Sequence, residues 1–291
     1  MHCNRFERAI RTWFLHMALI LAMGLGLAAC QPGHEAVSDW RSGWVTWKTP
    51  DDCAALIATA KSLRFHALIT HGSPEQMRQF SERTAAAGLE SYWWFSPCRP
   101  AGAKPGEYDQ QVAENERPLM EAQLKDTEKM QHGYQGGGEP LPGHTEFNFC
   151  PIACFHRTEV MDATREAIRN TLASAPKLTG IAFDMFGYYN YRFCACPDSM
   201  RQLAEWQRLH PGMADDAARD AFSLESLVAR QNELAGYART LRPAIRITCH
   251  VWPTLLQEPL YGNQLDFDMC CQTAAWYFEP YWTDERITSY G

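Results

Sequence analysis

The stretch that decides the fold is residues 178–197, LTGIAFDMFGYYNYRFCACP. Its apolar run, residues 181–183, follows a Thr-Gly turn and ends at a single carboxylate, Asp184. A continuous apolar run between helical segments is typical of a strand that is buried on both faces of a parallel sheet. In a β/α barrel the carboxyl ends of the strands form the mouth of the active site, so we predict a functional role for Asp184.

Aromatic side chains follow Asp184 along the chain, and Tyr188 is one of them. An aromatic wall beside a carboxylate suits the binding of a sugar ring. The alternative is structural, with Asp184 capping the next turn or pairing with Arg192.

Strand and helix patterns alternate on both sides of this stretch, which predicts an α/β fold with a parallel sheet. We expect strands at 43–49, 65–70, 89–95, 180–184, 244–250 and 267–273, and helices at 51–63, 73–87, 156–174, 198–210 and 224–240. This order predicts a TIM-type (β/α) barrel that occupies residues 43–291. About six βα units are visible where a closed barrel has eight strands, so we expect the barrel to be incomplete at its C-terminus or the gene product to be truncated.

The pattern is interrupted at residues 98–146, which are rich in glycine, proline and charge. We interpret this segment as an insertion in the barrel, with one helix expected at 108–131. An insertion after a strand lies over the mouth of a barrel, where loops carry function, although a disordered excursion is the alternative.

The N-terminal residues 1–29 have the pattern of an export signal, with three arginines followed by an apolar stretch too short for a comfortable membrane span. They end in LAAC at residues 27–30, which resembles the lipobox of bacterial lipoproteins. The resemblance implies that Cys30 becomes a lipid-modified N-terminus and that the protein lies in the cell envelope, outside the cytoplasm. Residues 30–42 then form a tether. A plain secretory signal or an uncleaved anchor is the alternative.

The formal net charge of the chain is −7, and removal of residues 1–29 makes it more acidic. An acidic protein without a basic run lacks the electrostatic footprint of a nucleic-acid-binding protein, so we expect no nucleic-acid partner.

The order of these segments resembles the glycoside-hydrolase-like (β/α) barrels of exported bacterial proteins. In that family a Gly-Leu-x-x-x-x-Trp-Phe strand precedes an x-x-Pro helix start and a Gly-Ile-x-x-Asp-Tyr/Phe strand, and residues 88–95, 150–151 and 180–186 occupy these positions here. Such relatives often carry Cys-x-Cys-x-x-Cys after the strand, where this chain has Cys194 and Cys196 but Ser199 in place of the third cysteine. Chitinase-like barrels place a proton-donating Glu where this chain has Phe186, so chitinase chemistry is not expected.

Glycoside hydrolysis normally uses two carboxyl groups that flank the scissile bond. We predict Asp184 as one and Glu279 as the other, because Glu279 follows the sixth strand within an aromatic segment. His71 and His250 are expected to end the second and fifth strands and to bind sugar hydroxyls, unless they are packing residues. The further substrate-binding candidates are aromatic, although each is more often a core residue: Trp94, Tyr188, Trp252 and Trp276.

Four cysteines form a second group, Cys150 with Cys154 and Cys194 with Cys196. An extracytoplasmic location permits disulfides, and we expect Cys194 and Cys196 to be oxidised with Cys150 and Cys154 as their nearest partners. Four thiolates around zinc are the less favoured alternative, so we expect no cofactor unless zinc is bound.

The leading hypothesis is a cell-envelope glycoside hydrolase that acts on a polysaccharide or oligosaccharide by carboxylate acid/base catalysis. The second is a non-catalytic carbohydrate-binding lipoprotein with the same aromatic mouth. The third is a thiol- or zinc-dependent envelope protein that uses the four cysteines.

Overall fold

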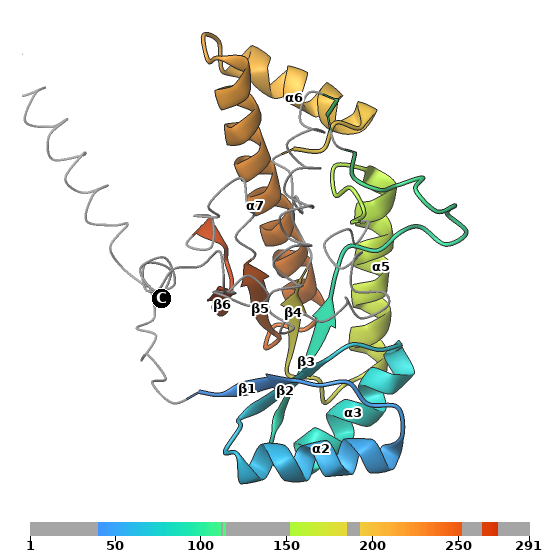
Figure 1. Ribbon diagram of the computed structural model, residues 1–291. Coiled ribbons are helices and arrows are strands. Elements are labelled where there is room, and N and C mark those ends of the chain that lie inside the picture. The colour runs from blue at the N-terminus through green and yellow to red at the C-terminus, as the bar shows by residue number, and fades with distance from the viewer. Residues whose placement is uncertain (1–39, 112, 115–151, 185–192, 252–263, 273–291) are drawn as a thin grey trace, which may run out of the picture. The chain divides into compact units, whose positions relative to one another are not determined.

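Six parallel strands form one sheet in the computed structural model (Figure 1), which describes residues 40–111, 113–114, 152–184, 193–251 and 264–272. The strands are β1 Ser42–Trp44, β2 Ala67–Thr70, β3 Glu90–Phe95, β4 Gly180–Phe183, β5 Arg246–Val251 and β6 Met269–Gln272. They lie side by side in the order in which they occur in the sequence, and each pairs in parallel with the next. The helices are α2 Pro50–Ser62, α3 Pro74–Ala86, α5 Thr158–Ser174, α6 Pro197–Leu209 and α7 Asp215–Leu241.

Sequential strand order distinguishes this sheet from a doubly wound one, in which the order reverses and helices cover both faces. Successive βα units that add on one side are the construction of a (β/α) barrel. The predicted α/β class and TIM-type arrangement are therefore confirmed, and the described strands supply six of the eight that a closed barrel has.

The chain divides into two compact units, Met1–Trp40 and Arg41–Gly291. The first lies outside the described residues except for Trp40, so the predicted signal peptide and most of the tether are not described. Within the described part of the chain, no helix combines the length and the apolar character needed to cross a membrane.

Helix starts follow local sequence signals. Ser73 caps α3: its side chain accepts a hydrogen bond from the backbone N–H of Gln76, while the Gln76 side chain accepts one from the Ser73 N–H. Thr49 and Asp52 form the same reciprocal pair at α2, and each helix has proline in its first turn. These caps satisfy backbone donors that a helix leaves unpaired at its N-terminus.

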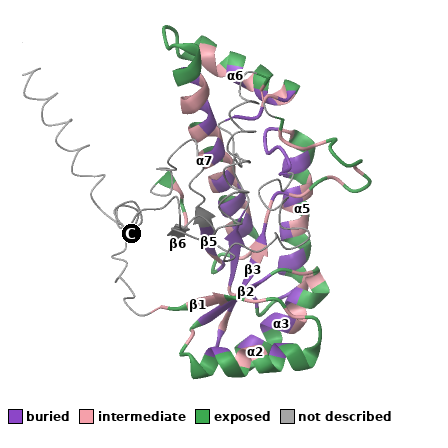
Figure 2. Cartoon of the chain, viewed as in Figure 1, coloured by how far each residue is buried: buried purple, intermediate pink, exposed green. Residues whose placement is uncertain are grey.

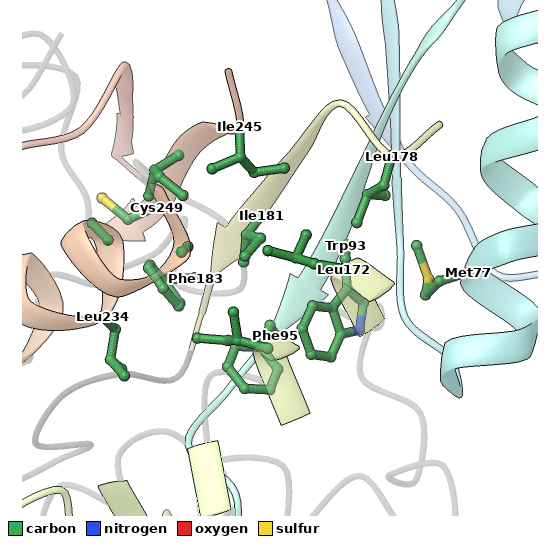
Figure 3. Packing of buried hydrophobic residues seen from close by; sticks show 14 of the residues in the cluster. Met77, Trp93, Phe95, Leu172, Leu178, Ile181, Phe183, Leu234, Ile245 and Cys249 are labelled. Atoms are coloured by element: carbon green, nitrogen blue, oxygen red, sulfur yellow. The ribbon is translucent and has the colours of Figure 1, made fainter. Parts of the chain in front are cut away.

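The alternation of side chains gives the sheet two chemically different faces. Trp93 and Phe95 of β3 point to one face together with Ile181 and Phe183 of β4, because the register pairs Trp93 with Ile181 and Phe95 with Phe183. This face packs against the helices and forms the main core (Figure 3). We call the opposite face the inner face.

The helix-covered face carries the large apolar cluster. Its buried residues come from the strands, from α2, α3, α5 and α7, and from the segments that connect them. Figure 2 shows the buried residues along the strands and along the helix sides that meet them, with exposed residues on the outer side of α2. A smaller cluster joins Phe193, which precedes α6, and Leu203 of α6 to Phe222 of α7.

The inner face is polar at its amino end. The Glu90 carboxylate pairs with the Arg246 guanidinium at 2.7 Å and accepts a hydrogen bond from the Tyr92 hydroxyl at 3.0 Å. Burial, together with the nearby Glu90 charge, raises the pKa of Tyr92. The Tyr92 ring lies against the backbone of Gly180, its partner on β4, because a Cβ atom at Gly180 would come within 2.3 Å of that ring.

The structure corrects two predicted helix boundaries. Residues 108–111 and 113–114 are not helical, so the expected helix at 108–131 is wrong at its start, and its remainder lies outside the described residues. Asp109 instead bridges antiparallel to Ala153, which commits the backbone there to pairing with residues 152–154. Helix α7 starts at Asp215 instead of residue 224, with Asp215 and Asp216 in its first turn, where acids favour a helix.

Candidate functional site

Asp184 directly follows β4 at the carboxyl edge of the sheet. Its backbone N–H donates to the Phe95 carbonyl at 2.8 Å, which continues the ladder between β3 and β4 by one residue. Its side chain is 3% exposed, and its Oδ2 accepts a hydrogen bond from the indole Nε1 of Trp94. The two side chains meet because Trp94 is opposite Ala182, so that Trp94 and Asp184 both lie on the inner face.

Two aromatic rings, one from β1 and one directly after β2, lie beside Trp94. The Trp44 ring at the end of β1 lies 5.2 Å from the Trp94 ring, and the His71 ring after β2 lies 5.6 Å from it in an edge-on arrangement. Trp94 is half-buried, His71 is exposed and Trp44 is 48% exposed. These three rings and Asp184 form what we call the edge site, which combines apolar ring faces with an imidazole and a carboxylate.

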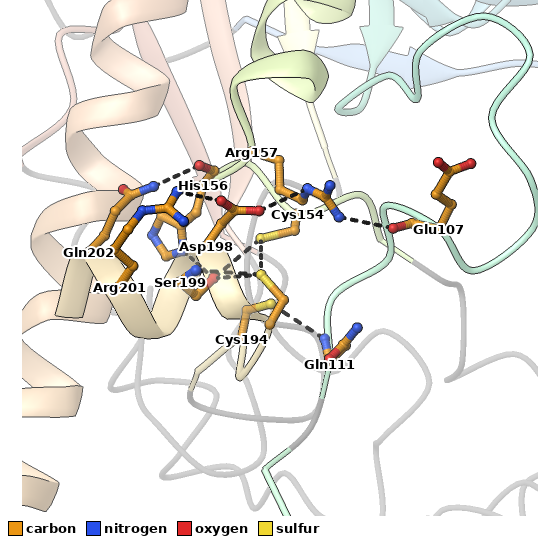
Figure 4. Close-up of polar contacts among 11 residues, drawn as sticks. Glu107, Gln111, Cys154, His156, Arg157, Cys194, Asp198, Ser199, Arg201 and Gln202 are labelled. Carbon is orange, nitrogen blue, oxygen red and sulfur yellow. Dashed lines mark hydrogen bonds and ion pairs between the residues drawn. The ribbon is translucent and has the colours of Figure 1, made fainter. Parts of the chain in front are cut away.

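Three buried thiols form a separate cluster beside the start of α6 (Figure 4). The thiols belong to Cys154, Cys194 and Cys196, which are at most 1% exposed, and their Sγ atoms lie within 4.8 Å of one another. The Cys154 and Cys196 Sγ atoms are 3.6 Å apart. The Ser199 hydroxyl oxygen lies 3.4 Å from the first and 3.2 Å from the second. We call these three cysteines and Ser199 the thiol cluster.

Hydrogen bonds inside the cluster shift the pKa values of two of its thiols in opposite directions. Bonds from Cys154 and then from Cys194 hold the pKa of Cys196 well below its usual range, whereas bonding to Cys194 and Cys196 raises the pKa of Cys154. His156 lies beside the cluster, with Nδ1 2.7 Å from the Ser199 hydroxyl, and burial lowers its pKa to about 4. The His156 ring stacks on Phe222 at 5.1 Å.

Comparison with known proteins identifies structures that share the fold of this chain. No protein-family model matches the chain, and no curated protein matches it. Among solved structures, a β-galactosidase from the Antarctic haloarchaeon Halorubrum lacusprofundi matches with a TM-score of 0.53 at 12% identity, over 81% of this chain and 39% of the other. A cold-adapted β-galactosidase from Rahnella sp. R3 matches with a TM-score of 0.51 at 13% identity, over 84% of this chain and 40% of the other.

The chain has a glycoside-hydrolase-like (β/α)-barrel fold. It spans about two fifths of the length of the two β-galactosidases. Identities this low show the shared fold and leave the chemistry of the barrel to be argued from its own residues.

The barrel brings three predicted residues of the carbohydrate site together. Asp184 and His71 each contact Trp94 at the edge site. His250 was expected to end its strand but lies one residue before the last residue of β5, Val251, because the ladder with β6 continues through both. The remaining predicted residues lie outside the described chain: Glu279, Tyr188, Trp252 and Trp276, together with Arg192, Cys30 and Cys150.

Sequence reasoning missed Trp44 as a site residue. The strand predicted at 43–49 put Trp44 near its amino end, whereas β1 ends at Trp44 and its register with β2 places that ring at the carboxyl edge of the sheet. The inner face carries a second carboxylate, Glu90, but it lies at the amino end of β3 and is held by Arg246.

The expected disulfides are not present among the cysteines whose side chains are described. The shortest sulfur separation in the thiol cluster is 3.6 Å, whereas a disulfide bond is about 2.05 Å long. Ser199, which departs from the family pattern at the third cysteine position, is also part of the cluster.

Proposed function

We propose that this protein is a glycoside hydrolase of the cell envelope that binds a polysaccharide or oligosaccharide at the edge site. The single observation that carries the proposal is the position of Asp184 at the carboxyl edge of a barrel sheet, in contact with the half-exposed indole of Trp94. In (β/α) barrels this edge forms the active-site mouth. The neighbouring Trp44 ring provides a further exposed apolar face, and such faces suit the stacking of sugar rings.

Each residue of the edge site has a role in this proposal. Trp44 and Trp94 bind the apolar face of the sugar, and His71 hydrogen-bonds its hydroxyl groups. Asp184 acts at the reacting sugar as one of the two carboxyl groups that hydrolysis requires. Glu279 is the proposed partner, on the sequence argument alone.

The decisive variant is Asp184→Asn, which removes the charge and keeps an oxygen that can accept the Trp94 hydrogen bond. Turnover of a cleaved glycan should fall by about 10²–10⁴-fold, while glycan affinity changes little, because loss of an acid or base affects mainly the chemical step. Product release from a panel of glycans measures the first effect, and calorimetric binding measures the second. Trp94→Phe is the matched binding variant, since it keeps an aromatic ring while it removes the indole donor and part of the ring surface. A folded Asp184→Asn protein with unchanged turnover removes Asp184 from catalysis.

A non-catalytic carbohydrate-binding protein is the second candidate. The observation that favours it is the near-complete burial of Asp184 against Trp94, which fits a carboxylate that positions the indole ring. In that case the wild-type protein binds a glycan and releases no product from it, and Trp44→Ala weakens binding.

The envelope location is proposed from the sequence of residues 1–30, with Cys30 as the lipidated residue. Cys30→Ala should release the protein from the membrane fraction or leave its signal uncleaved. A processed Cys30→Ala protein that still sediments with membranes contradicts the lipid anchor.

A further inference from the structure

The thiol cluster lies at a junction of three chain segments that are distant in sequence. Cys154 precedes α5, Cys194 and Cys196 precede α6, and residues 108–111 run alongside. Ala195 N–H donates to the Gln111 carbonyl at 2.7 Å, and Cys154 N–H donates to the Tyr108 carbonyl at 2.8 Å. Backbone hydrogen bonds therefore tie residues 108–111 to both segments that carry the three cysteines.

The distances among the Cys154, Cys196 and Ser199 donor atoms match a tetrahedral metal site, and the Cys194 Sγ lies within 4.8 Å of both other sulfurs. Zinc binds thiolates at about 2.3 Å, which places neighbouring sulfurs of a tetrahedron about 3.8 Å apart. The observed Cys154–Cys196 separation is 3.6 Å. An oxygen ligand at about 2.1 Å lies about 3.6 Å from each sulfur of such a site, and the Ser199 oxygen lies 3.4 Å and 3.2 Å from the same two sulfurs.

We propose that Cys154, Cys194 and Cys196 bind a zinc ion and that the Ser199 hydroxyl occupies its fourth position. Three thiolates select a soft or borderline cation over magnesium or calcium, which take oxygen ligands. The burial of all four donors excludes solvent, which is the property of a structural zinc site with no position open to substrate.

The groups around the donors orient them for this role. Backbone N–H groups of Gln111 and Ser199 point at the Cys194 and Cys196 sulfurs, at 3.4 Å and 3.5 Å, and such donors favour the thiolate form. When His156 Nδ1 accepts a hydrogen bond from the Ser199 hydroxyl, the lone pairs of that oxygen can face the sulfurs and the metal. Hydrogen bonds of this kind beyond the ligands fix ligand orientation in metal sites. Binding releases the thiol protons to solvent and involves no redox change.

A disulfide is the competing fate of these cysteines. A bond between Cys154 and Cys196 requires their sulfurs to approach from 3.6 Å to about 2.05 Å and uses two of the three clustered thiols. Zinc uses all three thiols. The zinc site does not depend on any activity at the edge site, so zinc can be bound whether or not the protein hydrolyses glycosides.

The test is metal analysis of the purified full chain, prepared with a thiol reductant and without chelator. We expect one equivalent of zinc in the wild type and its loss in Cys154→Ala. Cys98→Ser should retain the zinc, because Cys98 lies outside the thiol cluster. Ser199→Cys should tighten zinc binding and Ser199→Ala should weaken it, each by about tenfold or more in competition with a chromophoric chelator. Cobalt substitution adds a spectroscopic readout, because the charge-transfer band should strengthen from three thiolates in the wild type to four in Ser199→Cys.

A second measurement keeps the test decisive if Cys154→Ala does not fold. Zinc should protect the three cluster cysteines of the wild type from alkylation, and removal of zinc with a chelator should expose them. Absence of zinc, zinc without this protection, or a disulfide among the three cysteines in unreduced peptides overturns the site. Equal zinc affinity of wild type, Ser199→Ala and Ser199→Cys overturns the assignment of the fourth ligand.

Discussion

Replacement of Gly180 by alanine should destabilise the barrel at the first residue of β4. An alanine Cβ would lie 2.3 Å and 2.5 Å from two atoms of the Tyr92 ring and 2.5 Å from the Arg246 carbonyl oxygen. Neither neighbour can withdraw easily. Tyr92 is fully buried with its hydroxyl held by Glu90, and the Arg246 carbonyl belongs to the paired strand β5. Overpacking a rigid core typically costs about 1–3 kcal/mol, and contacts this short on two sides put Gly180→Ala at about 3 kcal/mol.

Thermal unfolding followed by circular dichroism measures this effect. For a domain of this size about 3 kcal/mol lowers Tm by roughly 6–12 °C. Gly236→Ala is the matched control, because Gly236 lies in α7 and a Cβ there meets no atom within 4 Å. It should raise stability by about 0.5–1 kcal/mol, since alanine favours a helix over glycine. Combining Gly180→Ala with Tyr92→Ala should cost less than the sum of the two single changes. A Gly180→Ala protein with the wild-type Tm refutes the reasoning.

Three further predictions concern other parts of the fold. Phe183→Ala should lower the free energy of unfolding by about 3–5 kcal/mol in denaturant titrations, because the side chain is 1% exposed and packs against Phe95 in the core; a loss below 1 kcal/mol contradicts the packing. Ser73→Ala should cost about 1 kcal/mol in the same assay through loss of the α3 cap, whereas Ser73→Asp should retain most of it. Burial raises the pKa of Cys98 to about 11, so at pH 8 its alkylation should be about a hundredfold slower than that of a thiol with a pKa of 9 and should keep rising with pH up to about 11. A rate that levels off near pH 9 shows an unperturbed thiol.

Local sequence patterns predicted the order of the described strands and two of the helix starts, but the first strand ends at Trp44 instead of residue 49. The apolar run at residues 181–183 and the Ser73-Pro74-Glu75 start of α3 are decided by neighbours in sequence, and both appear as expected. The helix expected from residue 108 failed because Asp109 pairs with Ala153, a contact between segments that periodicity does not detect.

The candidate sites were predictable to different degrees. The parallel arrangement predicted that Asp184 and His71 lie at one edge of the sheet, because both follow strands. The hydrogen bond between Trp94 and Asp184 depends on the register of β3 with β4, which sequence spacing does not supply. The thiol cluster required three chain segments to meet, and the contribution of Ser199 emerges only from its distances to two sulfurs.

The two-faced sheet also limits how such a protein can change over time. Within β3, Trp93 packs in the core and Trp94 lies at the edge site, so neighbouring residues are constrained by different contacts. Insertion or deletion of one residue in this strand would exchange the two sets, placing a core residue in the site and a site residue in the core. New ligand preferences can therefore arise by substitution at every second strand position, or by lengthening the segments that follow the strands. A one-residue change within a strand would not create a new site in this way, because it would disrupt the core at the same time.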